Sequence, residues 1–462
     1  MLAIANGVSP LFTVNQNSYL LHAMAQAGYG RLQSGWMAQT TDLTPVFSAL
    51  VAAGYRLMGS PFLYLAQLTA ASILFGSLLL IVRRDLTRAQ LVLMAAGLAI
   101  VVSPPTRQFD PFVIPFWGVA EQYVLSTYFQ PSDAGVLIVL AVAVSLGHTR
   151  GAPLLAAALS GVAALLHPTY LLPGGLVTLG IAAVGYRETR RPGRALAPLV
   201  VYALVCAPMA LYVLGNLPMS DAAARILARS RIPHHALPDV WFGVDDAARI
   251  VIVALAVWLH RSERIGLILG AAGVTSLVAS VVAAGLGYDR MLLTFPWRVS
   301  VVLVPISAAL LMARSIRGIA GTFTNNRLSR IIPATAAVGL VCLMGSSIVL
   351  SAREIAEPEP FESVPDGMYL IPPDLQDFRL ESGQPVLVDA KTHPYRGDEV
   401  MEWWRRLRAA QRFYASGTCE PLSRVRARWP GITHVVLPGG TSVPCVGPQA
   451  GRAGSYDIYR VD

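Results

Sequence analysis

Ten apolar segments occupy about half of the first 350 residues and constrain the fold more than any other feature of the chain. A helix that crosses a bilayer needs about 20 predominantly apolar residues, and several segments are shorter, so two of them could be re-entrant or broken. With 54% hydrophobic and 14% charged residues, the chain departs from soluble proteins, in which about 25% of residues are charged. We therefore expect a polytopic α-helical membrane protein with about ten transmembrane helices, at residues 62–82, 90–104, 134–147, 153–167, 171–186, 195–214, 248–260, 266–285, 298–313 and 330–350.

Basic residues predict the orientation of these segments. The net charge of +9 is also typical of nucleic-acid-binding proteins. Here, however, the arginines cluster in alternate short connections, which the positive-inside rule places in the cytoplasm, so we expect no nucleic-acid partner. The longer connections, the first loop and the C-terminal tail then face outside. The cytoplasmic set comprises Arg83, Arg84, Arg88, Arg150, Arg187, Arg190, Arg191, Arg194, Arg261, Arg264, Arg314, Arg317, Arg327 and Arg330.

The N-terminal 61 residues read as a first outside loop with short interfacial helices. No cleavable signal peptide is expected, and the first residues resemble the end of a spanning helix whose beginning would lie upstream. Within this loop, Asp42 is the only carboxylate before Asp85. A lone acid in an amide- and aromatic-rich segment beside a membrane bundle could act as a general base. Alternatively, Asp42 caps a helix that begins at Pro45, and the two roles are compatible.

Residues 351–462 have the composition of a small water-soluble α/β domain, after a transmembrane bundle at 62–350. Strands are predicted at 385–390, 433–438 and 456–461. An amphipathic helix is predicted at 397–414, with Val400, Trp404, Leu407 and Gln411 on one stripe. Two further cysteines lie in apolar runs, whereas Cys419 and Cys445 could form a disulfide if this domain is extracytoplasmic.

The second outside loop, residues 105–133, is longer than a simple connection needs to be and could line a site. Its polar candidates are Arg107, Asp110, Glu121, Gln122 and Tyr123. Glu121 is the strongest candidate among these residues, because its neighbours are apolar enough to enter the membrane interface. The alternative is that Glu121 is a solvated carboxylate on an interfacial helix.

Three more basic side chains lie at predicted outer helix ends. His167 precedes Pro168, where it could bind a phosphate or a sugar hydroxyl, or else satisfy carbonyls that the proline leaves free. Arg290 and Arg298 lie on the outer side, against the positive-inside trend. Beside aromatic residues they could form a phosphate clamp, or they could extend toward lipid headgroups.

The predicted strand-to-helix junction of the outer domain gathers Lys391, His393 and Glu399, with Asp398 as an alternative helix cap. Loop 215–247 carries several basic and acidic residues, but their spacing matches no standard metal site, so we assign no metal ligands. We interpret this loop as one that binds an acceptor or lipid. No Walker loop, nucleophile elbow, GxGxxG or CxxC motif occurs, which excludes the soluble ATPase, hydrolase and dehydrogenase classes that depend on them.

The loop-one aspartate, the long second outside loop, about ten helices and a C-terminal outer domain together resemble the GT-C superfamily of polytopic glycosyltransferases. More closely, the chain looks like a bacterial family of uncharacterised multi-spanning proteins. The segments that carry this second resemblance are NQNSYLLHAMAQAGYG, TTDLTPVFSALV, GVAEQYVLSTYFQPSDAGV, LLHPTYLLP, FPWRVS and VDAKTHPYRGDEVMEWWRRL.

The GT-C resemblance implies sugar transfer from a polyprenyl-phosphate donor to a glycan or lipid acceptor on the outer face. Asp42 would then be the base, and Arg290 or Arg298 would hold the donor phosphate. The superfamily often has a pair of acids in loop one, whereas this chain has a single acid there. The role of the second acid would then fall to Glu121 or Asp110. No cofactor is assigned, and a divalent metal ion stays open. The expected location is the bacterial inner membrane.

Two other classes of function remain as alternatives. A transporter or flippase would show charges inside its spanning segments and symmetric halves, neither of which is visible in the sequence. A non-catalytic scaffold subunit of a polysaccharide system would work through its outer domain.

Overall fold

The computed structural model describes residues 1–462 except 108–115, 323–327, 357–360, 362–363, 442 and 462. The chain forms two compact units, each assembled from three separate stretches. We call them the helical unit (1–9, 64–212 and 232–354) and the α/β unit (10–63, 213–231 and 355–462). The first loop and the C-terminal region, which are far apart in the sequence, therefore belong to one unit.

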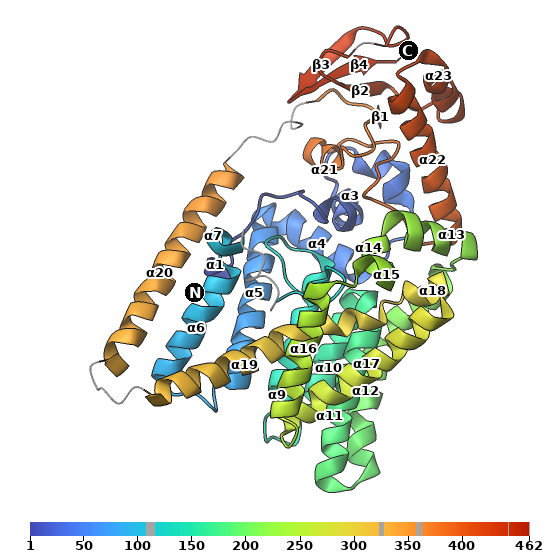
Figure 1. The fold of residues 1–462 in the computed structure, drawn as a ribbon. Helices are drawn as coiled ribbons and strands as arrows, with labels where there is room; N and C mark the ends of the chain where they lie inside the picture. Colours follow the sequence, from blue (N-terminus) through green and yellow to red (C-terminus); the bar gives the residue numbers. More distant parts are fainter. Residues whose placement is uncertain (108–115, 323–327, 357–360, 362–363, 442, 462) are drawn as a thin grey trace. The chain divides into compact units, whose positions relative to one another are not determined.

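The helical unit contains the long apolar helices (Figure 1). Among the described residues, six helical stretches are long and apolar enough to cross a membrane, which makes this a multi-pass membrane protein. Its helices are α1 (Leu2–Ala5), α5 (Pro61–Val82), α6 (Arg88–Val102), α7 (Pro104–Arg107), η4 (Pro131–Gly135), α9 (Val136–Ser145), α10 (Ala152–Leu166), η5 (Pro168–Tyr170), α11 (Leu171–Thr189), α12 (Pro192–Asn216), α14 (Pro233–Ala236), α15 (Pro238–Trp241), α16 (Val244–Leu259), α17 (Arg264–Leu286), α18 (Asp289–Leu292), η7 (Pro296–Val299), α19 (Ser300–Thr322) and α20 (Leu328–Ile355).

Each of the ten expected apolar segments overlaps a helix, but ten membrane crossings are not confirmed. Several of these helices are too short to count as spans because of local sequence. Helix α6 ends before Pro104 and α10 ends before Pro168, since a proline disfavours helical backbone in the residue that precedes it. The first turns of α16 carry Asp245, Asp246 and Arg249, which shorten its apolar stretch.

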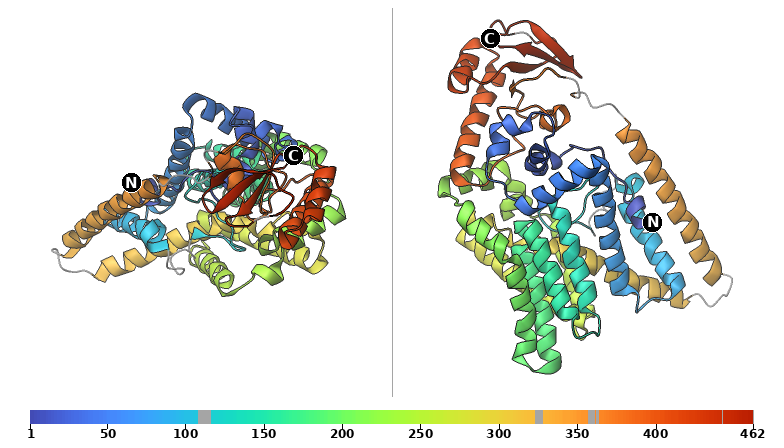
Figure 2. Two further views of the ribbon diagram at one scale, coloured as in Figure 1. Left: turned by 90° about the horizontal axis from the view of Figure 1, so that it is seen from above. Right: turned by 180° about the vertical axis from the view of Figure 1, so that it is seen from behind.

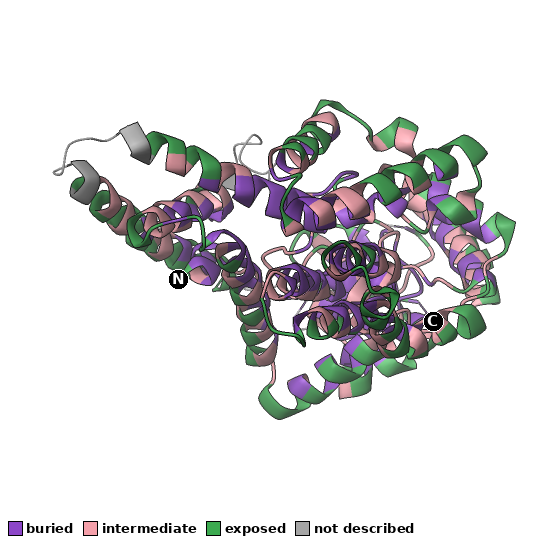
Figure 3. Ribbon diagram, turned by 90° about the horizontal axis from the view of Figure 1, so that it is seen from below, coloured by how far each residue is buried: buried purple, intermediate pink, exposed green. Residues whose placement is uncertain are grey.

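In the core of the helical unit, α9 packs against α10, α10 against α11, and α11 against α17 (Figure 1). A glycine lets α11 approach α17 closely: a Cβ on Gly180 of α11 would lie 2.7 Å from the carbonyl oxygen of Ile268 in α17. By contrast, α12 and α20 expose large apolar side chains such as Leu204, Leu211, Val338 and Val349. Figure 3 marks exposed residues along the ribbon in green. In a membrane protein these exposed apolar faces are suited to lipid.

Among the described residues, the α/β unit contains a four-stranded sheet in the order β1-β2-β4-β3. Its C-terminal strands are drawn in red in Figure 2. Strands β1 and β2 are parallel, and the other two pairs are antiparallel. The elements are α2 (Gln16–Tyr19), α3 (Leu21–Ala27), η1 (Leu32–Ser34), η2 (Trp36–Gln39), α4 (Pro45–Met58), α13 (Asp221–Ile226), η6 (Leu227–Arg231), β1 (Tyr369–Leu370), α21 (Phe378–Ser382), α22 (Gly397–Ser416), α23 (Cys419–Arg428), β2 (His434–Pro438), β3 (Gln449–Ala453) and β4 (Tyr456–Arg460).

The predicted strands at 433–438 and 456–461 are confirmed as β2 and β4, whereas the strand predicted at 385–390 is wrong. Residues 385–390 make only an isolated bridge, between Val386 and Tyr369, before the chain turns away. Strand β3 was not predicted, because its sequence QAGRA has no β-branched or aromatic residue. A disulfide joins Cys419, at the start of α23, to Cys445, with 5.5 Å between the Cα atoms.

Helix α22 confirms the predicted amphipathic helix, but the buried stripe differs from the prediction. The buried side chains include Val400, Trp403 and Leu407, so Trp403 takes the place expected for Trp404. The indole nitrogen of Trp403 donates a hydrogen bond to the carbonyl oxygen of Asp389 (3.1 Å). This polar contact, which the spacing of apolar residues could not predict, fixes which tryptophan faces inward.

Candidate functional site

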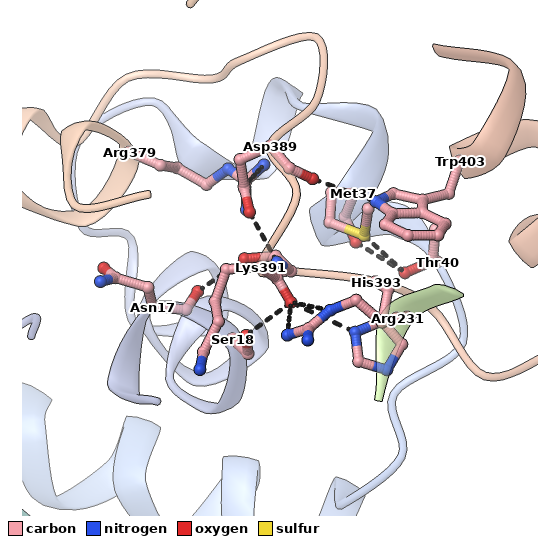
Figure 4. A network of polar contacts seen from close by, with 11 residues as sticks. Asn17, Ser18, Met37, Thr40, Arg231, Arg379, Asp389, Lys391, His393 and Trp403 are labelled. Carbon is pink, nitrogen blue, oxygen red and sulfur yellow. Dashed lines mark hydrogen bonds and ion pairs between the residues drawn. The ribbon is translucent and has the colours of Figure 1, made fainter. Parts of the chain in front are cut away.

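In the α/β unit, the backbone carbonyl of Lys391 is contacted by side chains from three parts of the chain (Figure 4). The oxygen of Lys391 accepts hydrogen bonds from Ser18 Oγ (3.3 Å) and from Arg231 Nη2 (2.6 Å) and Nε (3.2 Å). His393 Nδ1 lies 3.2 Å from the same oxygen. The first loop, the segment after α13 and the C-terminal region therefore meet at residue 391.

A buried ion pair supports this segment from within the α/β unit. The carboxylate of Asp389 lies 2.6 Å from Arg379 Nη2, and both side chains are at most 3% exposed. Asp389 Oδ1 also accepts the backbone N–H of Thr392 (2.5 Å). The hydroxyl of Thr392 donates to the carbonyl of Asn17 (3.2 Å), so the ion pair also fixes the start of the first loop.

Asp42 lies just before helix α4, which begins at Pro45 as expected. Its Oδ1 accepts a hydrogen bond from the backbone N–H of Thr44 (2.8 Å). Asp42 thus pairs one of the backbone N–H groups at the start of the helix. The imidazole Nδ1 of His22 lies 3.9 Å from the same oxygen, and 13% of the Asp42 side chain is exposed. A carboxylate at a helix N-terminus is stabilised by the helix dipole and can still reach a ligand from that position.

Glu399 of α22 holds the Asp42 loop in place. Its carboxylate accepts hydrogen bonds from the backbone N–H (2.9 Å) and the hydroxyl (3.0 Å) of Thr41. His22 Nε2 lies 3.0 Å from the carbonyl of Thr40, which anchors the same loop on its other side. Glu399 is thus placed to position Asp42 through its sequence neighbour.

A small cavity opens at this place, with a volume of about 30 Å³. The ring nitrogen Nε2 of His393 is shielded from solvent and has no hydrogen-bond partner among the described residues. Burial, and next the charge of Arg231, lower the pKa of His393 to about 3. Burial and Arg231 likewise lower the pKa of the Lys391 ammonium to about 8. The cavity is lined by Ser18, Tyr19, His22, Met37, Thr41, Asp42, Leu43, Thr44, Thr392, His393, Pro394 and Tyr395.

The second outside loop is anchored within the helical unit by its backbone. The N–H of Val119 donates to Ser300 Oγ (2.9 Å), and the N–H of Ala120 donates to Asp246 Oδ1 (3.0 Å). Ala120 and Glu121 both have positive φ, at 59° and 54°, so the chain turns sharply here. That turn leaves the Glu121 side chain exposed.

The neighbouring residues of this loop face inward to different degrees. Gln122 is 3% exposed, and its amide atoms have no partner among the described residues. The hydroxyl of Tyr123 lies 2.9 Å from that of Tyr128. Arg107 is the last residue of α7. Asp110 lies outside the described residues.

The helical unit brings His167 and Arg298 to the same tyrosine. The guanidinium of Arg298 lies 5.3 Å from the centre of the Tyr170 ring, and the His167 ring is 5.7 Å from it in an edge-on arrangement. Tyr170 in turn donates its hydroxyl to the carbonyl of Ser132 (2.6 Å). Arg290, in contrast, is an exposed residue of α18.

The predicted site residues therefore fall into two groups. Asp42, Lys391, His393 and Glu399 belong to the α/β unit, and the predicted phosphate and sugar contacts belong to the helical unit. In the described part of the chain, no three His, Cys, Asp or Glu residues form a cluster suited to a metal ion.

Sequence reasoning gave no role to several residues of the α/β site. Arg231 lay in a loop noted for its charges, but its partner is a carbonyl about 160 residues away, which no local pattern reveals. Arg379 had no signal in the sequence other than its charge. Tyr19 and His22 lie in the same segment as Asp42 and line the cavity. In the sequence, the signal for this role was the presence of their rings near Asp42.

Six long apolar helical stretches among the described residues indicate a multi-pass membrane protein, and the small cavity beside Asp42 is lined by residues outside these stretches. Residues 362–410 match a family model described as a domain of unknown function, DUF6798. This match spans the segment from Arg379 to Leu407 that builds much of the α/β site. No curated protein matches the chain.

One similar solved structure is the oligosaccharyltransferase of Archaeoglobus fulgidus, crystallised with zinc and sulfate. The two chains are 12% identical, and the match covers 95% of this chain and 67% of the other, with a TM-score of 0.41. At this TM-score the match does not establish a common fold.

Proposed function

We propose that the protein is a membrane glycosyltransferase that moves a sugar from a polyprenyl-phosphate donor to an acceptor on the extracytoplasmic face. The observation that carries this proposal is the cavity in which Asp42 meets aromatic and imidazole side chains from two distant segments. Aromatic rings and hydrogen-bonding side chains around a carboxylate form a suitable site for a hydroxylated substrate. The many apolar helices suit a donor that is itself a membrane lipid.

In this mechanism Asp42 accepts the proton of the acceptor hydroxyl as its oxygen forms a bond to the anomeric carbon of the sugar. The bond between that carbon and the phosphate oxygen breaks, and the polyprenyl phosphate leaves with the electron pair. Attack from the opposite face inverts the anomeric centre. Stabilisation of the charge on the leaving phosphate by Arg290 or Arg298 is proposed from the sequence. Within the helical unit, the guanidinium of Arg298 lies over the ring of Tyr170.

The remaining predicted residues would line the sugar pocket. Gln122 has a buried amide with hydrogen-bonding capacity, and Glu121 and Tyr123 flank it in the same turn. His167, next to Tyr170, would contribute a further polar contact. Arg107 and Asp110 are proposed for the same pocket from the sequence alone. We propose the inner membrane of a bacterium as the location, with the α/β unit outside.

The test is transfer by the full-length protein in lipid nanodiscs, supplied with polyprenyl-phosphate-linked hexoses and pentoses and with glycan and lipid acceptors. The variant Asp42→Asn keeps the size of the side chain and should lower transfer about 100- to 10,000-fold, because the base is lost. Glu420→Gln, at an exposed carboxylate of α23, is the matched control and should transfer normally. Undiminished transfer by Asp42→Asn would remove Asp42 from the mechanism.

A further inference from the structure

A large apolar pocket in the helical unit is lined mainly by α16, α17 and the start of α19. We call it the α16–α17 pocket; its volume is about 610 Å³, and all of its lining residues belong to this unit. Most of the lining side chains are aliphatic or aromatic, and several of them, such as Ile250, Val274 and Leu277, are exposed. In a multi-pass membrane protein, a pocket that opens between such side chains opens toward lipid.

A buried arginine of α16, Arg249, lines this pocket. Arg249 is 6% exposed, and its Nη1 donates a hydrogen bond to Asp246 Oδ1 (3.0 Å). Asp246 is itself fixed by the backbone N–H groups of Ala120 (3.0 Å) and Gly243 (3.2 Å). The Nε of Arg249 is shielded from solvent and has no hydrogen-bond partner among the described residues. A buried N–H without a partner is unfavourable, so a ligand that pairs it gains binding free energy.

A second donor without a partner lines the same pocket. Trp241 of α15 packs against Trp297, with 5.1 Å between the ring centres. Its indole Nε1 is shielded from solvent and has no hydrogen-bond partner among the described residues. Indole and guanidinium nitrogens only donate, so a ligand that satisfies both Trp241 and Arg249 must bring acceptor oxygens.

Neighbouring polar groups of the pocket are paired within the protein. Ser276 Oγ donates to the carbonyl of Pro296 (2.7 Å), and Ser280 Oγ donates to the carbonyl of Ser276 (2.8 Å). Trp297 Nε1 donates to the carbonyl of His235 (3.1 Å). The unpaired donors of Trp241 and Arg249 are therefore exceptions to the local pattern.

The charges around Arg249 select the kind of acceptor. Asp246 already neutralises Arg249, so a ligand that adds net charge would bring an uncompensated charge into buried surroundings. A phosphate monoester, as in a polyprenyl phosphate, carries a charge of about −1.5 to −2 at neutral pH. A zwitterionic phospholipid adds no net charge, because its ammonium offsets its phosphodiester. That ammonium is suited to an aromatic ring such as that of Phe242, which also lines the pocket.

We propose that the α16–α17 pocket binds a zwitterionic glycerophospholipid of the phosphatidylethanolamine type. Its phosphate oxygens accept hydrogen bonds from Arg249 Nε and Trp241 Nε1, and its acyl chains lie against the apolar side chains of α16 and α17. From Arg249 to Trp258, α16 rises by about 14 Å, which is about the depth of one leaflet in a hydrocarbon core about 30 Å thick. This binding is independent of the proposed glycosyl transfer, because it involves none of the residues assigned to that reaction.

The experiment is native mass spectrometry of the full-length protein, purified in detergent, stripped of lipid and titrated with single lipids. The lipids are palmitoyl-oleoyl phosphatidylethanolamine, the phosphatidylglycerol and diacylglycerol with the same chains, and undecaprenyl phosphate. Arg249→Lys keeps a cation beside Asp246 and removes the Nε donor. Trp241→Phe removes the indole N–H and keeps an aromatic ring. Arg261→Gln is the matched control, because Arg261 lines the same pocket but is exposed and donates to the carbonyl of Trp258 (2.8 Å).

We expect the wild type to bind one phosphatidylethanolamine more tightly than each of the other three lipids. Trp241→Phe should weaken this binding roughly 5-fold and Arg249→Lys roughly 10-fold, because a buried hydrogen bond to the phosphate is lost in each. Arg261→Gln should bind as the wild type does. Diacylglycerol should bind equally to all four proteins, because it lacks the phosphate. If Arg249→Lys does not fold, the comparison of Trp241→Phe with Arg261→Gln decides.

Several results would overturn the proposal. Equal binding of phosphatidylethanolamine by Trp241→Phe and the wild type would show that the indole N–H does not contact the headgroup. Equal binding of phosphatidylglycerol or diacylglycerol by the wild type would show that the zwitterionic headgroup is not recognised. Tighter binding of undecaprenyl phosphate, weakened by the same substitutions, would make the pocket a site for the proposed donor. A lipid-stripped dimer that binds none of the lipids would show that a second copy of the chain covers the pocket.

Discussion

At the scale of single residues, the site depends on groups whose ordinary chemistry is changed by their neighbours. His393 is kept from protonation by burial and by two adjacent cations, and Asp389 is fully buried because Arg379 compensates its charge. Such arrangements are costly unless every partner is present. Residues held this way are suited to recognising a ligand, since their hydrogen-bonding roles are fixed before the ligand arrives.

The depressed pKa of His393 predicts how acid affects the fold. An unfolded histidine has a pKa near 6.5, and the folded value is about 3, so between these values the unfolded state binds more protons. Stability from this group is therefore present above about pH 6.5 and is lost as the pH falls toward 3. His393→Gln cannot titrate and should lose less stability than wild type between pH 7 and pH 4.

Thermal unfolding of the purified protein in detergent, followed by tryptophan fluorescence at several pH values, measures this difference. His148→Gln replaces an exposed histidine of the helical unit and serves as the control. Parallel pH profiles for wild type and His393→Gln would show that the ring is protonated equally in both states, contrary to the prediction.

At the scale of elements, α22 connects the stability of the α/β unit to the placement of the catalytic candidate. One face packs Val400, Trp403 and Leu407 into the interior, and the first turn presents Glu399 to the loop that carries Asp42. The same helix thus serves the fold and the site. Its existence and amphipathic character were predictable from sequence, whereas its contact with residue 41 was not.

Removing this contact should loosen the Asp42 loop without unfolding the unit. We expect Glu399→Ala to speed hydrogen exchange of the Thr41 amide roughly 10-fold, because its hydrogen-bond acceptor is gone. Transfer activity should fall in parallel. Exchange measured by mass spectrometry over residues 38–44 tests this, with the neighbouring exposed carboxylate variant Asp398→Asn as the control. An unchanged exchange rate in Glu399→Ala would show that Glu399 does not hold the loop.

At the scale of the whole molecule, the sequence predicted apolar helices well and long-range assembly poorly. Apolar periodicity and length are local, so all ten segments fall on helices. The grouping of the first loop with residues 355–462 depends on contacts such as that between Asn17 and Asp377, which no local pattern encodes. For the same reason Asp42 could be selected from sequence, while Arg231 and Arg379 could not.

The arrangement of arginines predicts the topology of the whole chain. Arg190 and Arg191 lie between α11 and α12, and Arg187 and Arg194 lie in the adjoining helix ends, so the positive-inside rule assigns this connection to the cytoplasm. The C-terminal region should lie on the other side, where the disulfide between Cys419 and Cys445 is stable against reduction. In bacterial cells, alkaline phosphatase fused after Asp462 should be active and green fluorescent protein there should be dark.

Fusions after Arg191 provide the opposite expectation and an internal control. Fluorescent protein at that point should be bright and phosphatase inactive, because the connection faces the cytoplasm. If the fusion after Asp462 were fluorescent instead, the α/β unit would lie in the reducing compartment. Asp42, which belongs to the same unit, would then face cytoplasmic substrates, and the donor and acceptor would have to be sought on that side.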